Sequence, residues 1–225
     1  MLRMKNPVGL IFVLLMSLGS CPRSAVAGEF LGGLSAGTSG GLGVQATGTL
    51  ANFTRDLPLS LRIGIGYHTG NAGDPYAARR VFINDNTNGT AEDSAHQWQF
   101  RVDLLYPVIK LRTQEIFLFA GPRHARYTAN FNYVGGNENF DVKASPWGAG
   151  LGLETRFAIN DKTSFLLQLG VDYYQDVELA GHDTVYTPEG DHINPRDGYD
   201  YSDADDAIDQ PSLEVLAMMG VLMGF

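Results

Sequence analysis

Two polar segments carry the oxygen-rich side chains that hard cations bind. The first, "NDNTNGTAED", is close to the calcium-loop spacing D-x-[DN]-x-[DN]-G. Its candidate ligands are Asn84, Asn86, Asn88 and Glu92. The match is imperfect, because asparagine stands at the first position and Ala95 occupies the place of the bidentate glutamate. This segment therefore predicts weak calcium binding at best.

The second segment, "DGYDYSDADDAID", is denser in carboxylates. Its candidate ligands are Asp203, Asp205, Asp206 and Asp209. Carboxylates at this density attract divalent cations, but a solvated acidic loop has the same composition. We predict weak binding of Ca²⁺ or another divalent cation at these two segments, and no other cofactor.

Histidine chemistry has little support in the sequence. His68 and His96 fall near Ser94, at a spacing that suggests no mechanism. His124 lies in "RHARYTAN", which lacks the H-x-S-N arrangement of the lipid A deacylase family. We therefore predict no catalytic residue and no enzymatic activity.

The start of the chain is typical of an exported protein. Arg3 and Lys5 precede the apolar stretch "PVGLIFVLLMSLG", and residues 25–27 form an A-x-A cleavage signal. We predict a signal peptide over residues 1–27 and one domain over residues 28–225. "LGSC" offers an alternative, in which Cys21 is lipidated as in bacterial lipoproteins.

Charge and cysteine content exclude several classes of protein. From residue 28 onward the chain has 13 basic and 25 acidic residues, which gives a net charge of about −12. Nucleic-acid binding needs a basic surface, so we predict no nucleic-acid partner. Cleavage after Ala27 would also remove Cys21, the single cysteine of the chain, and with it any thiolate metal site.

The elements that must position these loops are strands. In "HQWQFRVDLLY" apolar and polar residues alternate, and "LSLRIGIGYH" and "SFLLQLGVDYYQD" follow the same period of two. Eight segments qualify, near residues 30–37, 42–53, 59–68, 96–107, 115–134, 138–157, 164–176 and 212–225. Tight turns at 55–58, 110–114 and 160–163 all fall on one side, and long connections at 69–95 and 177–211 fall on the other.

Aromatic placement and the last strand complete the pattern. Aromatic residues gather near both strand ends: Phe53, Tyr106, Phe117 and Phe157 by the turns, and Tyr67, Trp98, Tyr127 and Tyr173 by the loops. The ending "LEVLAMMGVLMGF" alternates as a strand and stops on Phe225. It resembles the C-terminal assembly signal of bacterial outer-membrane proteins.

The chain from residue 28 resembles the small eight-stranded barrels of the OmpA transmembrane-domain and OmpX type. That resemblance implies an all-β, up-and-down antiparallel transmembrane barrel with short periplasmic turns and long extracellular loops. It also implies location in the bacterial outer membrane, contact with outer-membrane lipid and lipopolysaccharide, and a monomer.

An eight-stranded barrel has a bore that side chains can fill. We predict an inward set of balanced charges that closes the bore. The set is Arg62, Arg101, Arg126, Lys143 and Arg156 with Asp103, Asp141, Glu154, Asp172 and Glu214. A narrow passage is the alternative.

The hairpin 115–157 is about twice the length that a bilayer requires, so its upper half is expected to protrude as a ribbon. Across it we expect Thr128 to pair with Lys143. The apolar face changes phase at Ser145-Pro146, which predicts a β-bulge. An exposed ribbon could pair edge to edge with a partner, or merely stiffen a loop.

These observations predict a structural or surface-binding (adhesion-type) role, with an extracellular protein or another surface ligand as partner. The alternative is a narrow transport barrel for small or apolar solutes, and a lipid-modifying enzyme is the third choice.

Overall fold

The computed structural model describes residues 28–54 and 57–225 of the 225-residue chain. The predicted signal peptide, its cleavage site and Cys21 lie outside the described residues. The first described strand begins at Glu29, directly after the predicted leader.

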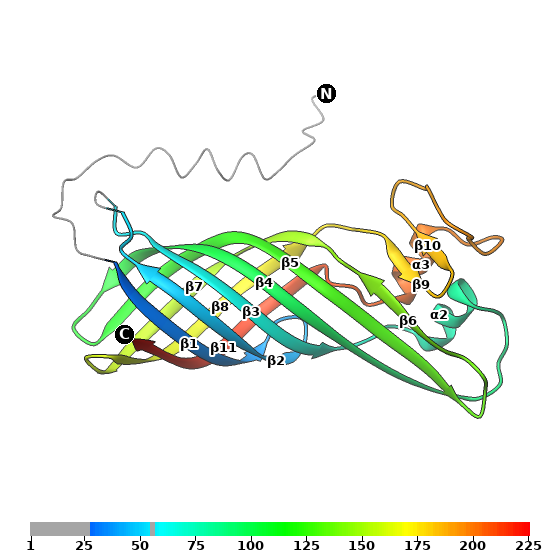
Figure 1. The fold of residues 1–225 in the computed structure, drawn as a ribbon, viewed down its shortest axis with the longest axis horizontal. Coiled ribbons are helices and arrows are strands. Elements are labelled where there is room, and N and C mark those ends of the chain that lie inside the picture. The colour runs from blue at the N-terminus through cyan, green and yellow to red at the C-terminus, as the bar shows by residue number, and fades with distance from the viewer. Residues whose placement is uncertain (1–27, 55–56) are drawn as a thin grey trace, which may run out of the picture.

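Eight antiparallel strands close into a barrel (Figure 1). They are β1 (Glu29–Thr38), β2 (Leu42–Ala51), β3 (Ser60–Gly70), β4 (Thr90–Lys110), β5 (Gln114–Val134), β7 (Trp147–Asn160), β8 (Thr163–Tyr174) and β11 (Leu213–Gly224). Each strand pairs with the next in this order, and β11 pairs with β1 from Leu31↔Gly224 to Thr38↔Ala217. The predicted all-β, eight-stranded up-and-down barrel is confirmed.

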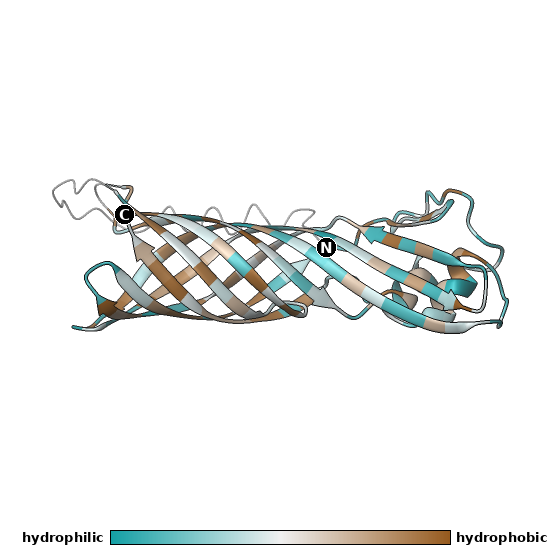
Figure 2. Ribbon diagram, turned by 60° about the horizontal axis from the view of Figure 1, so that its bottom comes forward, coloured by the Kyte–Doolittle hydropathy of each residue, from teal (hydrophilic) through white to brown (hydrophobic). Residues whose placement is uncertain are grey.

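The barrel is apolar outside and polar inside, as the alternation predicts. Along β4, Trp98, Phe100 and Val102 point outward and are exposed, while the intervening Gln99 and Arg101 are buried in the bore. Figure 2 shows apolar residues along the exterior of the barrel strands. A closed barrel satisfies all its backbone hydrogen bonds, so such an exterior is suited to lipid.

A small folded cap covers the end of the barrel that carries the long connections, called here the loop end (Figure 1). The cap comprises segments 71–95, 128–146 and 175–212. It contains the upper parts of β4 and β5 together with β6 (Asn139–Ala144), β9 (Leu179–Gly181), β10 (Thr184–Tyr186), α2 (Pro75–Phe82) and α3 (Tyr201–Ala207). The C-terminus lies at the opposite end, called here the turn end.

The cap has an apolar core of its own. Phe131, Tyr133 and Phe140 from β5 and β6 pack with Phe82 of α2 and Ala204 of α3, and all five are buried. The strands order as β4-β5-β6-β9-β10, so the loop connections extend the barrel wall into a sheet that the helices cover. The long connections are therefore folded structure.

Both cap helices begin at an aspartate that accepts hydrogen bonds from the first-turn backbone. Asp74 accepts from the N–H groups of Tyr76 and Ala77 at 2.9 and 3.1 Å, ahead of Pro75. Asp200 and Asp203 form a reciprocal capping box. Within residues 28–54 and 57–225, no helix is long and apolar enough to cross a membrane.

The predicted β-bulge at Ser145-Pro146 is wrong. Tyr127 pairs with Ala144, the last residue of β6, and His124 pairs with Trp147, the first residue of β7, so the register is unchanged across the break. Phe140 in the cap and Gly150 in the barrel share the inward face of the strand. The polarity of the surroundings changes instead: inward-facing side chains meet an apolar core in the cap and other polar side chains in the bore. The expected pairing of Thr128 with Lys143 is confirmed.

Three further expectations need correction. Phe117 points into the bore and Tyr127 into the cap core, so neither belongs to an aromatic girdle. The exposed aromatic residues near the loop end are Tyr67, Trp98, Trp147 and Tyr173.

Tight turns are not confined to one end, because residues 39–41 join β1 to β2 at the loop end. The upper half of hairpin 115–157 is not a free ribbon, because β6 pairs with β9 at Val142↔Gly181 and Lys143↔Ala180.

Replacing Phe131 by alanine tests whether the cap has a separate core. The side chain is fully buried in the cap, and Phe→Ala changes in a core cost about 3–5 kcal/mol. We expect F131A to make the cap sensitive to added protease while the barrel keeps its heat-dependent gel shift. The control is Asn132→Ala, on the opposite face of the same strand. Equal protease resistance of F131A and N132A would contradict a separate cap core.

Candidate functional site

The centre of the bore is occupied by Asp103 and three arginines. Asp103 Oδ2 accepts from Arg62 Nη2 at 2.7 Å and from Arg101 Nε at 2.8 Å, and its Oδ1 accepts from Arg123 Nη1 at 2.7 Å. All four side chains are buried. One carboxylate thus ties together strands β3, β4 and β5.

Two further carboxylates extend the network toward β7 and β8. Glu154 pairs with Arg62 and with Arg156, the latter at 2.6 Å, and accepts from Gln168 Nε2 at 2.7 Å. Asp172 accepts from Arg123 Nε at 2.7 Å. These bonds cross the bore from wall to wall and close it.

Aromatic rings lie beneath the arginines. The guanidinium carbons of Arg62 and Arg101 are each 5.0 Å from the centroid of the Phe119 ring, and that of Arg156 is 4.1 Å from Phe117. Desolvated cation–π contacts of this kind stabilise buried arginines by about 2 kcal/mol. The Phe119 ring also fills the space beside its cross-strand partner Gly152, which has no side chain.

The predicted ionic network is present, with a different membership. Arg62, Arg101, Arg156, Asp103, Glu154 and Asp172 lie in it as expected. Glu214 is buried in the bore as expected, but no ion pair joins it to a basic residue in the described structure. Arg126, Lys143 and Asp141 are exposed on the outer face instead. Arg123 replaces Arg126, because β5 keeps its odd-numbered residues inward along its whole length. The inward direction of odd-numbered residues could have been found from the sequence, by continuing the alternation of Phe131 and Tyr133 back along the strand to Arg123.

The turn 39–41 folds into the loop-end mouth of the bore. Ser39 is fully buried, and its hydroxyl lies 3.4 Å from both Asp172 and Glu214. Its backbone carbonyl accepts from Gln97 Nε2 at 3.0 Å. Gly40 has a φ of +65°, and a Cβ there would overlap the Glu214 carboxylate, so glycine is required.

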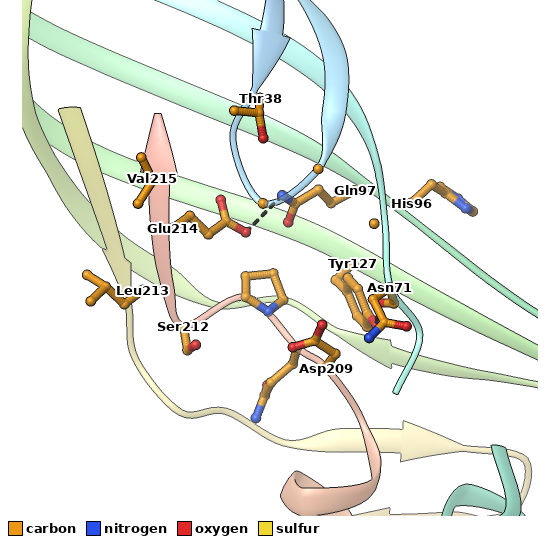
Figure 3. A pocket seen from close by; sticks show the side chains of 15 residues that line it. Thr38, Asn71, His96, Gln97, Tyr127, Asp209, Ser212, Leu213, Glu214 and Val215 are labelled. Carbon is orange, nitrogen blue, oxygen red and sulfur yellow. Dashed lines mark hydrogen bonds between the residues drawn. The ribbon is translucent and has the colours of Figure 1, made fainter. Parts of the chain in front are cut away.

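Two cavities flank the closed centre. One, of about 320 Å³, lies between the mouth and the cap, and residues such as Gln97, Glu214, Asp209 and Tyr127 line it (Figure 3). The other, of about 1300 Å³, opens at the turn end, where Ser60, Phe117 and Arg156 are among its lining residues. The charge network separates them.

No family model matches the chain, and no curated protein matches it by sequence. Among solved structures, a major outer membrane protein of Thermus thermophilus superposes with a TM-score of 0.72 and 20% identity, covering 89% of this chain and 100% of that one. At this identity the likeness shows the fold, and the exterior described above suits that fold to a membrane.

The chain has the fold of the small eight-stranded outer-membrane β-barrels. Neisserial surface protein A covers 90% of this chain and 100% of its own length, with 10% identity and a TM-score of 0.45. Ail, the attachment invasion locus protein of Yersinia pestis, in complex with the heparin analogue sucrose octasulfate, covers 89% and 100%, with 9% identity and a TM-score of 0.44.

In outer-membrane barrels of this fold the termini and short turns face the periplasm and the loop end, here the cap, faces outside. The asparagines predicted as calcium ligands make other contacts there. Asn84 and Asn86 donate to Glu138 at 3.0 and 3.4 Å, and Asn88 accepts from Arg79, which also pairs with Glu138. Glu92 lies apart, on the edge of β4, where it accepts from Asn132.

The acidic candidates of the second segment are spread around α3. Asp203 belongs to the capping box, Asp205 accepts from Gln210 at 2.6 Å, and Asp209 lines the cavity beneath the cap. Asp206 is exposed. Across the described part of the barrel and cap, no three acidic or histidine side chains gather where they could hold a metal ion. Cation binding at these residues therefore stays a prediction without a preformed site.

The histidines of the barrel occupy three different surroundings. His124 stacks on Trp147 at 4.6 Å on the outer face, and His96 stacks on Tyr67 at 5.7 Å. His68 is fully buried in the bore. No hydrogen bond joins any of the three to Ser94 within the described residues. This arrangement offers no nucleophile–base pair.

Replacing Asp103 by asparagine tests the central network of the barrel. The change leaves three arginines facing a neutral side chain, and removing one partner of a buried pair costs about 3–5 kcal/mol. We expect D103N to unfold at a lower urea concentration than the wild type when refolded into lipid vesicles and followed by tryptophan fluorescence. D141N, an exposed β6 variant with the same chemical change, should unfold as the wild type does. Equal midpoints for D103N and D141N would contradict a central role for Asp103.

The Glu138 cluster predicts a loss of local order in acid. Hydrogen bonds from Asn84 and Asn86 and the charge of Arg79 lower the pKa of Glu138. A carboxyl group with a lowered folded pKa stabilises the folded state above its ordinary pKa of about 4.3, and this is lost as pH falls through the folded value. The hydrogen-exchange protection of segment 84–89, relative to the intrinsic exchange rate at each pH, should therefore fall below about pH 4. E138Q should abolish that acid dependence, and an unchanged pH profile in E138Q would disprove the assignment.

Proposed function

We propose that this outer-membrane barrel is a non-catalytic surface-binding protein, in which the barrel anchors an acidic cap that docks basic partners outside the cell. The observation that carries the proposal is the separation of charge between cap and barrel. The cap contains 17 acidic and 4 basic residues, a formal charge of −13, while the rest of the chain from residue 28 sums to +1.

The closed bore supports binding over transport. Arg62, Arg123 and Arg156 are paired across it, and the turn 39–41 fills its outer mouth. A solute would have to break several buried ion pairs to pass. The long connections are accordingly the part of the protein available for a function.

A rigid acidic surface favours capture of basic partners. Like charges on one face produce a field that raises association rates and gives specificity for opposite charge. The core around Phe131 and Phe140 holds this surface in one conformation, so little ordering entropy is lost on binding. Lys143 and Arg196 are among its few cations, and Arg196 is already paired with Asp85 at 2.9 Å.

β4 presents a strand edge in the cap that no other described strand pairs with. Its pairing with β3 ends at Gly70↔Ala95, and Thr90–Ser94 continue beyond it with Glu92 and Asp93 exposed. The β6 edge, by contrast, is taken by β9. Acidic side chains along an edge discourage pairing with a second copy and favour a basic segment.

Adhesion of cells that display the protein tests the proposal. Expressing cells should adhere to a surface coated with a basic protein such as hen lysozyme, and not to one coated with serum albumin. Changing Glu189, Asp191, Asp197 and Asp206, all exposed in the cap, to their amides should reduce adhesion several-fold and weaken its salt dependence.

Two results would overturn the proposal. One is equal adhesion by cells with the wild-type cap and with the four-amide cap at matched surface expression. The other is reproducible conductance steps from the refolded wild-type protein in a planar bilayer, which would indicate a transport barrel. The control variant is Asp161→Asn, on the periplasmic turn between β7 and β8, which should leave adhesion unchanged.

A further inference from the structure

The cavity beneath the cap lies where three parts of the protein meet. Its walls come from the turn 39–41, from the segment 209–215 that leads into β11, and from Asn71 and Tyr127 at the base of the cap. Its volume of about 320 Å³ is at the lower end of the range for small-molecule sites. Figure 3 shows Gln97 and Glu214 on its barrel side and Asp209 on its cap side.

Glu214 is a buried carboxylate without a basic partner in the described structure. Its exposed fraction is 7%, yet it forms none of the ion pairs that hold Asp103, Glu154 and Asp172. It accepts only from neutral donors: Gln97 at 2.9 Å, Gln99 at 2.7 Å and the Ser39 hydroxyl at 3.4 Å. Buried charges are normally paired, so this wall of the cavity lacks a cation.

Gln97 adds an unpaired acceptor at the same wall. Its side chain is 3% exposed, and its Nε2 donates to Glu214 and to the Ser39 carbonyl, which fixes the orientation of the amide. Its Oε1 is then buried without a hydrogen-bond partner. Gln210, another lining residue, is similar: its Nε2 donates to Tyr201 and Asp205, and its Oε1 has no partner.

We infer that this cavity binds a small primary amine in its ammonium form. An ammonium group has three N–H donors and no acceptor, which matches the Glu214 carboxylate, the Gln97 Oε1 atom and the Asp209 carboxylate across the cavity. The ring of Tyr127 adds an aromatic surface. No lysine or arginine lines the cavity to supply the charge from within.

A bare metal ion fits this cavity less well than an ammonium group. The described residues nowhere bring together three carboxylate or histidine ligands, and the lining has two carboxylates beside the three amide side chains of Asn71, Gln97 and Gln210. The site also differs from the outer surface of the cap, because two of its acceptors, Glu214 and Gln97, are buried between cap and barrel. The inference therefore goes beyond the proposed function and does not depend on it.

Titration with 1,5-diaminopentane tests the inference on the full chain refolded in lipid nanodiscs at physiological ionic strength. We expect saturable binding by calorimetry and a shift of the Gln97 side-chain amide signal in NMR spectra. Glu214→Gln should weaken binding about tenfold or more, because it replaces a charge-assisted hydrogen bond. Asp209→Asn, at an exposed position, should weaken it about threefold.

The matched control is Asp206→Asn, which removes the same charge three residues earlier at an exposed position outside the cavity. It should bind the diamine as the wild type does, and 1,5-pentanediol, a neutral analogue, should not bind. Equal weakening by D206N and D209N would show general attraction to the acidic cap and overturn the inference. So would absence of saturable diamine binding, or binding of pentanediol with equal affinity. If E214Q fails to fold, the comparison of diamine binding by D209N with diamine binding by D206N still tests the inference.

Discussion

The contact of Asp103 with three guanidinium groups is the interaction on which the rest of the structure depends. Eight strands enclose a bore that must be filled, and here it is filled by four arginines and by carboxylates that pair with them. Ion-paired side chains therefore occupy the centre of the barrel. Because the inward-facing wall residues close the bore, the proposed binding role falls to the connections at the loop end.

Much of the barrel could be predicted from alternation alone. Trp98, Phe100 and Val102 alternate with polar residues because one face of the strand meets lipid and the other meets the bore. The same rule identifies the last strand and its terminal Phe225. It works wherever a strand separates one apolar environment from one polar environment along its whole length.

The rule fails where the environment changes along a strand. In β5, Arg123 and Phe131 share one face, but the first meets the bore and the second meets the cap core. Reading that change of polarity as a change of phase led to the bulge at Ser145-Pro146 and to Arg126 in place of Arg123. The helices α2 and α3, of eight and seven residues, were missed because two turns are too short to show a helical period. The cavity beside Glu214 depends on segments far apart in the sequence, so no local pattern could reveal it.

The position of Ser39 has a consequence for how the barrel is assembled. Its partner Glu214 is on β11, the last described strand, and Ser39 directly follows β1, the first. At the other end of the same strand pair, the rings of Phe30 and Phe225 lie 6.1 Å apart. The contacts that seal the outer mouth therefore also join the two strands at which the barrel closes. A change that separates β1 from β11 would open the wall and the mouth together, while the ion pairs among β3, β4, β5, β7 and β8 hold the centre of the bore independently.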